Sequence, residues 1–344
     1  MIFRRAAITG IRSYLPSEVL PNQQLAAEFI DWDVEKIFKK TGIAKRHLAT
    51  PDETASDLGV LAAERLFNSG SWKPESVDFL LFCTQTPDYF LPASACIIQD
   101  RLGLRKDCGA LDFNLGCSGF IYGLALAKGL IEIGLADQVL LITADTYTKL
   151  IHPMDKSVRT LFGDGAAATL ISAVVSEEEF IGPFVFGTDG RGADKLIVAA
   201  GGFRKKPDEY TAIVKDDGAG NRRSAENLYM DGPEIFNFSL REVPRAVNEL
   251  LRKANITQDE VDFFIFHQAN RFMLEQLRRK LKIPTEKFCI NMESYGNTVA
   301  ATIPMAMEIA ISTGEIQDGF KIMLVGFGVG FSWGATLINF FRGN

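Results

Sequence analysis

Residues 77–83 read Val-Asp-Phe-Leu-Leu-Phe-Cys, and residues 261–267 read Val-Asp-Phe-Phe-Ile-Phe-His. Each run is preceded at equal spacing by a leucine of a helical pattern, Leu66 or Leu250, and by a polar turn. Short runs rich in Val, Ile, Leu and Phe are typical of buried central strands. The repeated pattern indicates two related α/β units within one chain.

Two further echoes follow in the same order. Gly116-Cys117-Ser118 and Gly296-Asn297-Thr298 each open an apolar stretch of the same length that ends at a glycine. Later, Ala-Ala-Thr-Leu-Ile at 167–171 matches Gly-Ala-Thr-Leu-Ile at 334–338. Three echoes in register are most simply explained by a duplication.

The two copies differ at places that matter for chemistry. Cys83 of the first copy becomes His267 in the second, and Cys117 becomes Asn297. Two related halves that differ in this way suggest a composite site that contains Cys117, His267 and Asn297. His267 ends a buried strand, where α/β folds place catalytic groups. Asn297 also suits a helix N-cap, and on local grounds alone that structural role is the better explanation.

Cys117 is the strongest candidate nucleophile. Glycines on both sides allow a sharp turn, and a very apolar helix begins just after it. A thiol at a helix N-terminus is expected to lose its proton more readily, which favours attack on a thioester. The alternative is an inert buried cysteine. For Cys83, Cys96 and Cys289 the apolar or helical surroundings favour core packing.

Composition narrows the class of protein. The chain has 344 residues, 47% of them apolar, and a net charge of −6, so a large core is expected and general attraction to nucleic acid is not. Five scattered cysteines fit reduced thiols rather than a disulfide framework. Neither a signal-like N-terminus nor an apolar run long enough to span a membrane is seen. We therefore expect a soluble cytoplasmic protein, and no pair of cysteines has the C-x-x-C spacing of a metal site.

Strand-like runs alternate with helical patterns, which predicts two mixed sheets layered with helices. Expected strands are 77–84, 139–144, 166–172, 261–267 and 322–327, and expected helices are 56–69, 118–133, 235–254 and 300–312. The predicted halves are 1–180 and 229–344. Between them, 181–228 is predicted to connect the halves, and its charged, glycine-rich part after residue 200 reads as a surface insertion or a lid.

Five ordered motifs resemble the β-ketoacyl-acyl carrier protein synthase III family of thiolase-fold condensing enzymes. They are Gly116-Cys117-Ser118-Gly119-Phe120, Leu161-Phe162-Gly163-Asp164-Gly165-Ala166, His267-Gln268-Ala269-Asn270, Gly296-Asn297-Thr298, and the segment from Gly326 to Gly334. The resemblance implies a homodimer with the five-layered αβαβα thiolase-like architecture and its two pseudo-symmetric halves. It also implies a catalytic triad of Cys117, His267 and Asn297.

The chemistry implied by the resemblance needs no cofactor. Cys117 would take an acyl group from an acyl-CoA or acyl-carrier donor, while the backbone N–H groups of Cys117 and Val329 hold the oxyanion. A malonyl group on acyl carrier protein would then lose CO₂, and His267 and Asn297 would stabilise the resulting enolate as it attacks the acyl-cysteine. Asn270, Phe236 and Gly328 are implied to line the pantetheine path.

Departures from the family pattern concern the substrate. Where some members clasp adenine with Trp and Arg, this chain has Lys36 and Lys156, and lysine does not stack as those residues do. Two interpretations remain: Lys36, Lys40 and Lys156 hold CoA through its phosphates, or the acyl donor is not CoA. Leu91 stands where some members have Phe, which predicts a tunnel, completed across the dimer, for longer or branched acyl groups.

Basic residues after the His267 motif suggest where an acidic carrier protein docks. Arg271, Arg278 and Arg279 are the main candidates, and an ordinary solvated helix face is the alternative. A second function also stays open: transfer of the acyl group from Cys117 to an alcohol or amine, in secondary-metabolite or surface-glycan assembly. Such a reaction needs no decarboxylation, so the intact pair of His267 and Asn297 argues against it.

Overall fold

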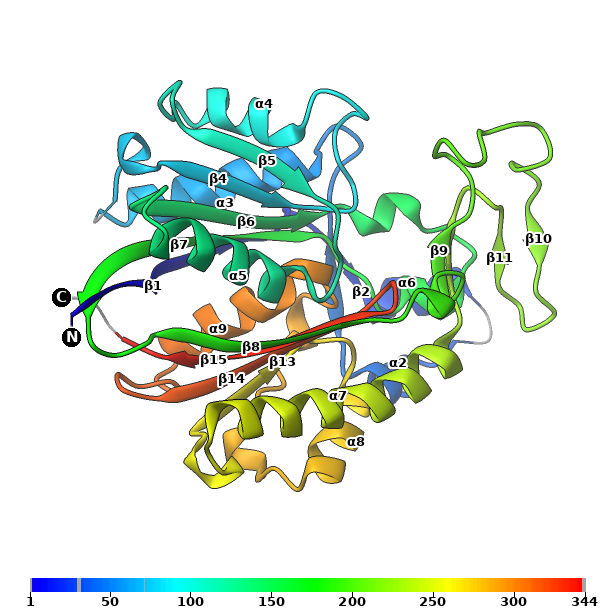
Figure 1. Cartoon of the computed structure of the whole chain (residues 1–344). Coiled ribbons are helices and arrows are strands. Elements are labelled where there is room, and N and C mark those ends of the chain that lie inside the picture. The colour runs from blue at the N-terminus through cyan, green and yellow to red at the C-terminus, as the bar shows by residue number, and fades with distance from the viewer. Residues whose placement is uncertain (1, 30–31, 71, 342–344) are drawn as a thin grey trace.

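The computed structural model describes residues 2–29, 32–70 and 72–341, so the outermost residues of the predicted halves lie outside the described part. Two sheets lie face to face, with helices between them and on both outer faces (Figure 1). The expected αβαβα layering is therefore confirmed. No helix of the described residues is long and apolar enough to cross a membrane.

The two sheets share one pattern of strand directions. The first has the order β1-β7-β6-β4-β5, and the second has the order β8-β15-β14-β13 when listed in the matching sense. In each, three strands run antiparallel to their neighbours and the next strand pairs in parallel. In place of β5, the second sheet has an isolated parallel bridge between Phe264 and Phe288. This shared pattern is the duplication seen in the sequence.

Two main sheets, one of five strands and one of four, and three short strand pairs are formed by the described residues. The strands are β1 (Phe3–Tyr14), β4 (Phe79–Cys83), β5 (Gly109–Phe113), β6 (Gln138–Asp145) and β7 (Gly165–Ser176) in the first sheet, and β8 (Ile181–Thr188), β13 (Phe263–Phe266), β14 (Lys321–Gly328) and β15 (Ser332–Asn339) in the second. The short pairs are β2 (Glu18–Pro21) with β3 (Lys45–Leu48), β9 (Leu196–Val198) with β12 (Leu228–Met230), and β10 (Lys215–Asp216) with β11 (Arg222–Arg223).

Two apolar helices, α5 (Gly119–Glu132) and α9 (Thr302–Ser312), lie between the sheets (Figure 1). Helices that are apolar nearly all round need this double cover. The outer layers are α3 (Ala55–Asn68) with α4 (Ser94–Arg101) on one side, and α7 (Gly232–Ala254) with α8 (Arg271–Leu281) on the other. Of three shorter helices, α1 (Asn22–Glu28) packs on α2 (Val34–Thr41), which also contacts α8, and α6 (Lys156–Arg159) packs on β12.

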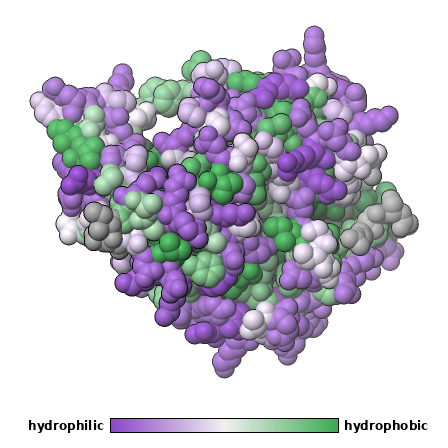
Figure 2. Space-filling model, turned by 180° about the vertical axis from the view of Figure 1, so that it is seen from behind, coloured by the Kyte–Doolittle hydropathy of each residue, from purple (hydrophilic) through white to green (hydrophobic). Residues whose placement is uncertain are grey.

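The connection between the halves differs from its prediction at one end. β8 is paired with β15, so residues 181–188 belong to the second sheet and not to a connector. The excursion (residues 201–227) protrudes from the body and carries the β10–β11 hairpin (Figure 1). Hydrophobic residues lie on its surface, and Phe203, Ile213 and Val214 are exposed (Figure 2).

Candidate active site

Cys117 lies in the turn immediately before α5, where the two halves meet. The turn is fixed by Gly119, whose N–H donates to the carbonyl oxygen of Gly116 at 2.7 Å. The next residue, Ser118, is hydrogen-bonded through its hydroxyl to the Ser332 hydroxyl of β15, at 2.6 Å. The nucleophile candidate is therefore held by both copies of the duplicated unit.

The end of β14 approaches Cys117 closely because two of its residues are glycines. A Cβ on Gly326 would lie 2.8 Å from the Cys117 carbonyl oxygen, and one on Gly328 would lie 2.9 Å from the Cys117 sulfur. Such distances exclude any side chain at these positions. The approach brings the backbone N–H of Val329 to the sulfur, which also meets the N–H of Cys117 itself. These are the two donors expected to hold an oxyanion.

The protonation of Cys117 differs from the prediction. Burial raises the pKa of the Cys117 thiol to about 12, and the nearby Asp145 carboxyl acts in the same direction. The two backbone N–H groups lower the pKa but do not outweigh the loss of solvation. The expected lowering of the thiol pKa is therefore wrong, and Cys117 rests as a neutral thiol.

His267 follows β13 and is neutral as well. Burial lowers the pKa of its imidazole from 6.5 to about 3. Its Nδ1 atom lies 2.7 Å from the Thr302 hydroxyl of α9, and its ring meets the Phe327 ring edge-on at 5.7 Å between centroids. The Thr302 hydroxyl also lies 3.0 Å from the Val299 carbonyl oxygen, so a proton on Nε2, which suits a neutral hydrogen-bond donor, requires this hydroxyl to turn from that carbonyl to Nδ1.

Asn297 is fixed to the first half through its backbone. Its N–H donates to the Leu161 carbonyl oxygen at 2.9 Å, and its own carbonyl oxygen accepts from the Gly163 N–H at 3.0 Å. The Asn297 side-chain oxygen accepts from the Val299 N–H at 3.0 Å. The structural role weighed for Asn297 is thus present in part, while its side-chain NH₂ remains as a donor.

The two turns that contain Gly163 and Gly296 both pack on a buried arginine, Arg46. A Cβ on either Gly163 or Gly296 would lie 3.1 Å from the Arg46 Cβ, so both turns rest on this residue. The Arg46 guanidinium donates to the Asn22 side-chain oxygen at 2.7 Å and to the Thr160 carbonyl oxygen at 3.1 Å. Burial lowers its pKa to about 10, with a further contribution from a neighbouring arginine. Arg46 positions the segments that carry Asn297.

Cys117, His267 and Asn297 line one pocket of about 80 Å³, together with Asn270 and Gly328. The remaining lining is apolar apart from backbone, and it comes from Leu161, Phe162, Leu196, Met230, Gly232, Ile235, Ala269, Met273 and Phe327. Each motif quoted from the sequence supplies part of this lining. A buried thiol, a neutral imidazole and an amide thus face one narrow, largely apolar space.

Comparison with known proteins agrees with this arrangement. The models of 3-oxoacyl-[acyl-carrier-protein] synthase III match residues 111–190, and those of its C-terminal part match residues 251–340. The β-ketoacyl-[acyl-carrier-protein] synthase III of Caldanaerobacter subterraneus subsp. tengcongensis is 37% identical over 333 residues, which is 97% of either chain. This chain belongs to the β-ketoacyl-acyl carrier protein synthase III family.

Solved structures of synthase III enzymes have the same fold. A 3-oxoacyl-(acyl-carrier-protein) synthase III crystal structure superposes with a TM-score of 0.97, at 55% identity over 98% of this chain and all (100%) of that one. The synthase from Burkholderia xenovorans LB400 superposes with a TM-score of 0.90, at 38% identity over 99% of this chain and 96% of that one. The thiolase-like fold expected from the sequence is confirmed.

Of the residues implied to line the pantetheine path of this synthase III chain, Asn270 and Gly328 line the pocket and Phe236 does not. Asn270 caps α8, and its side-chain oxygen accepts from the Met273 N–H at 2.8 Å. Phe236 stacks on Phe272 at 5.5 Å between ring centroids. Phe272 is exposed, and it was missed because an aromatic residue after Arg271 reads as ordinary helix surface. Leu91 is exposed and does not line this pocket in the single chain.

The predicted docking arginines have partners within this synthase III chain. Arg271 forms an ion pair with Glu293 at 3.2 Å. Arg278 and Arg279 both reach Glu275, at 2.9 Å and 3.6 Å. Arg278 also donates to a backbone carbonyl oxygen and is mostly buried, so Arg271 and Arg279 are the more accessible of the three.

Lys156 begins α6 beneath the excursion, and its ammonium group lies 5.3 Å from the centre of the Phe29 ring and 5.8 Å from that of Trp32. Trp32 was missed because it precedes the residue aligned with the family's tryptophan, Lys36, by one helical turn. Lys36 and Lys40 are exposed on α2. An aromatic residue therefore accompanies Lys156, although at a different sequence position from the one expected.

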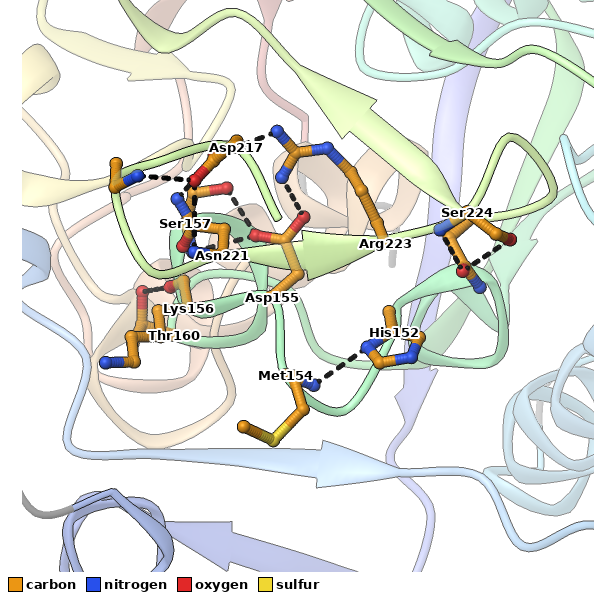
Figure 3. Close-up of polar contacts among 12 residues, drawn as sticks. His152, Met154, Asp155, Lys156, Ser157, Thr160, Asp217, Asn221, Arg223 and Ser224 are labelled. Atoms are coloured by element: carbon orange, nitrogen blue, oxygen red, sulfur yellow. Dashed lines mark hydrogen bonds and ion pairs between the residues drawn. The ribbon is translucent and has the colours of Figure 1, made fainter. Parts of the chain in front are cut away.

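An ion-pair latch holds the excursion against α6 (Figure 3). The fully buried Asp155 carboxylate accepts from Arg223 at 2.6 Å, and Arg223 also reaches Asp217 at 3.1 Å. The Asn221 side-chain oxygen accepts from the Ser157 N–H at 3.1 Å. These contacts place the tip of the β10–β11 hairpin next to Lys156, where a Cβ on Gly220 would be 3.7 Å from the ammonium nitrogen.

Proposed function

We propose that this chain catalyses decarboxylating condensation of an acyl thioester with a malonyl group on acyl carrier protein, in fatty acid or related acyl-chain biosynthesis. The observation that carries the proposal is the pocket that joins Cys117, His267 and Asn297. Membership of the synthase III family supports it. The reaction requires no cofactor.

In the first step the Cys117 sulfur attacks the carbonyl carbon of the donor thioester. The new S–C bond forms as the donor's C–S bond breaks, and the thiol proton of Cys117 leaves with the released donor thiol. Charge that builds on the carbonyl oxygen is held by the N–H groups of Cys117 and Val329. Each such donor contributes roughly 2.7–4 kcal/mol in comparable sites.

In the second step the malonyl group loses CO₂. The electron pair of the broken C–C bond moves into an enolate whose oxygen accepts from His267 Nε2–H and the Asn297 side-chain NH₂. The enolate carbon then attacks the acyl carbon, the bond to the Cys117 sulfur breaks, and the released thiolate takes up a proton from solvent to restore the neutral thiol. Because burial keeps His267 neutral, it donates a hydrogen bond without carrying a charge.

The partners follow from this chemistry. An acidic carrier protein would meet Arg271 and Arg279 on α8, where the Phe236–Phe272 pair, adjacent in sequence to the pocket residues Ile235 and Met273, offers an apolar contact for pantetheine. A CoA donor would place its phosphates near Lys156, Lys36 and Lys40. A reducing compartment such as the cytoplasm suits the free thiols of the five cysteines.

We further propose a homodimer formed at β5. Among the residues that the structure describes, this strand is paired only with β4, and an unpaired strand edge favours pairing with a second copy. Exposed Tyr89, Phe90 and Leu91 lie in the same half and would be covered in such a dimer. Leu91 would then approach the acyl group from the second copy. Sedimentation measurements test this state.

Intact mass spectrometry tests the reaction. The protein is incubated with acyl-CoA and acyl-carrier donors, with and without malonyl-carrier protein. A β-ketoacyl carrier product with loss of CO₂ supports condensation. Acyl-Cys117 that persists with malonyl-carrier protein but is discharged by an alcohol or amine would instead support an acyltransferase.

A further inference from the structure

A hydrogen-bonded pair of side chains, Tyr147 and Gln85, forms a wall beside the turn that carries Cys117. Tyr147 follows β6 and is buried, and its hydroxyl donates to the side-chain oxygen of Gln85 at 2.7 Å. Gln85 is held at two further points, because its N–H donates to Asp145 at 2.8 Å and its side-chain NH₂ donates to Asn114 at 3.2 Å. The wall is therefore rigid as well as polar.

This wall lies directly against the nucleophile's turn. A Cβ on Gly116 would be 2.5 Å from the Gln85 side-chain oxygen and 2.8 Å from a methyl group of Val329. The Tyr147 ring packs on Phe162 at 5.2 Å between centroids, and Phe162 lines the pocket with Cys117. Tyr147 and Cys117 also belong to the same buried cluster. They are close enough that a Cys117 thiolate would raise the pKa of the Tyr147 hydroxyl.

We propose that Tyr147 and Gln85 set the size limit of the acyl group, so that Cys117 accepts acetyl or propionyl groups and rejects medium-length chains. The inference rests on the proposed acyl transfer to Cys117 and deepens it. A longer chain on the sulfur would have to displace the Tyr147 ring. That movement would leave the buried hydroxyl and the Gln85 oxygen without their hydrogen bond, which is unfavourable.

The size limit at Tyr147 predicts short acyl groups, whereas Leu91 by itself predicts longer or branched ones. The Leu91 side chain is exposed in the single chain and would reach the acyl group only from a second copy. Tyr147 is part of the same chain and the same buried cluster as Cys117. The nearer wall decides the acyl length first, whatever space a smaller residue at position 91 leaves beyond it.

The test uses acetyl-, propionyl-, hexanoyl- and octanoyl-pantetheine, so that the nature of the donor's carrier does not matter. Rates of Cys117 acylation are followed by intact mass spectrometry for the wild type and for Tyr147→Leu. We expect the wild type to prefer acetyl over octanoyl by at least about tenfold, and Tyr147→Leu to accept octanoyl at least about tenfold faster. Tyr147→Phe, which retains the ring but loses the hydrogen bond to Gln85, should accept octanoyl at a rate between those of the wild type and Tyr147→Leu.

Tyr122→Leu is the matched control, because Tyr122 lies on α5 with its hydroxyl 3.4 Å from the carbonyl oxygens of Gly187 and Trp333. It should leave the acyl preference unchanged. If Tyr147→Leu does not fold, Gln85→Ala opens the same wall. Equal acetylation and octanoylation of the wild type would overturn the size limit. Failure of every thioester to modify Cys117 would instead show that the proposed acyl transfer is wrong.

Discussion

The Nδ1 atom of His267 lies 2.7 Å from the hydroxyl oxygen of Thr302, which itself lies 3.0 Å from the Val299 carbonyl oxygen. Thr302 therefore fixes the orientation of the imidazole, and the neutral Nε2–H tautomer requires its hydroxyl to donate to Nδ1 in place of the Val299 carbonyl oxygen. Thr302→Val should lower decarboxylation of the malonyl thioester about tenfold, the value of one hydrogen bond, and leave acylation of Cys117 unchanged. Thr302→Ser should restore the rate, and equal loss in both variants would contradict this positioning role.

We expect the three residues of the triad to act in different steps of the reaction. Cys117→Ala should abolish acyl-enzyme formation, whereas His267→Ala and Asn297→Ala should still form acyl-Cys117 and fail to condense, with losses of about 100-fold or more. Single-turnover mass spectrometry separates the two steps. Equal loss of acylation in three folded variants would show that the proposed roles are wrong.

Cys117 should be a slow thiol toward a small electrophile. Because its pKa is raised to about 12, the thiolate fraction at pH 8 is small and keeps rising about tenfold per pH unit up to pH 10. Cys96, which is exposed, serves as an internal control in the same molecule. Peptide mapping after brief iodoacetamide treatment measures both rates. Faster labelling of Cys117 than of Cys96 at pH 8 would contradict the neutral resting thiol.

His267 should make the protein sensitive to acid. The imidazole pKa is lowered from 6.5 to about 3 on folding, so below pH 6.5 the unfolded chain binds a proton that the folded chain does not. This one group should lower the folding equilibrium constant about tenfold per pH unit between about pH 6 and pH 3. Urea unfolding of wild type and His267→Asn at pH 7, 5.5 and 4.5 tests this expectation. Parallel pH profiles would refute it.

The latch between Asp155 and Arg223 should be the main support of the excursion. Arg223→Ala leaves a fully buried carboxylate without its ionic partner, a loss of about 3 kcal/mol in comparable pairs. We expect faster hydrogen exchange throughout residues 201–227. The neighbouring Arg222 is a matched control, since it is exposed and forms its ion pair with the exposed Asp216. Equal effects of Arg222→Ala and Arg223→Ala would show that the ion pair between Asp155 and Arg223 does not support the excursion.

Repetition made the main elements predictable. All five expected strands and all four expected helices are present, with ends that differ by a few residues. The predicted meeting of Cys117, His267 and Asn297 is also observed, because matching positions of duplicated units fall at the same end of each sheet. β8 was not recognised because Gly182 and Pro183 interrupt its pattern, and neither residue is typical of a strand interior.

Properties that depend on neighbours distant in the sequence could not be predicted. The Cys117 pKa depends on how deeply the second half buries it, which the local turn does not reveal. Cys96 was expected in the core and is exposed, because a helical stretch alone does not show which side faces the sheet. The Tyr147–Gln85 hydrogen bond joins residues from the ends of two adjacent parallel strands, and nothing in the sequence pairs them.

The burial of Cys117 also affects how the enzyme would withstand oxidative stress. Peroxides and disulfides react with thiolates, so a neutral thiol sheltered from solvent is a poor target for sulfenic acid formation and mixed-disulfide exchange. When a thioester carbonyl oxygen binds between the Cys117 and Val329 N–H groups, these two donors would stabilise the negative charge that develops on that oxygen as the sulfur attacks. The site would thus combine durability toward oxidants with reactivity toward its own thioester.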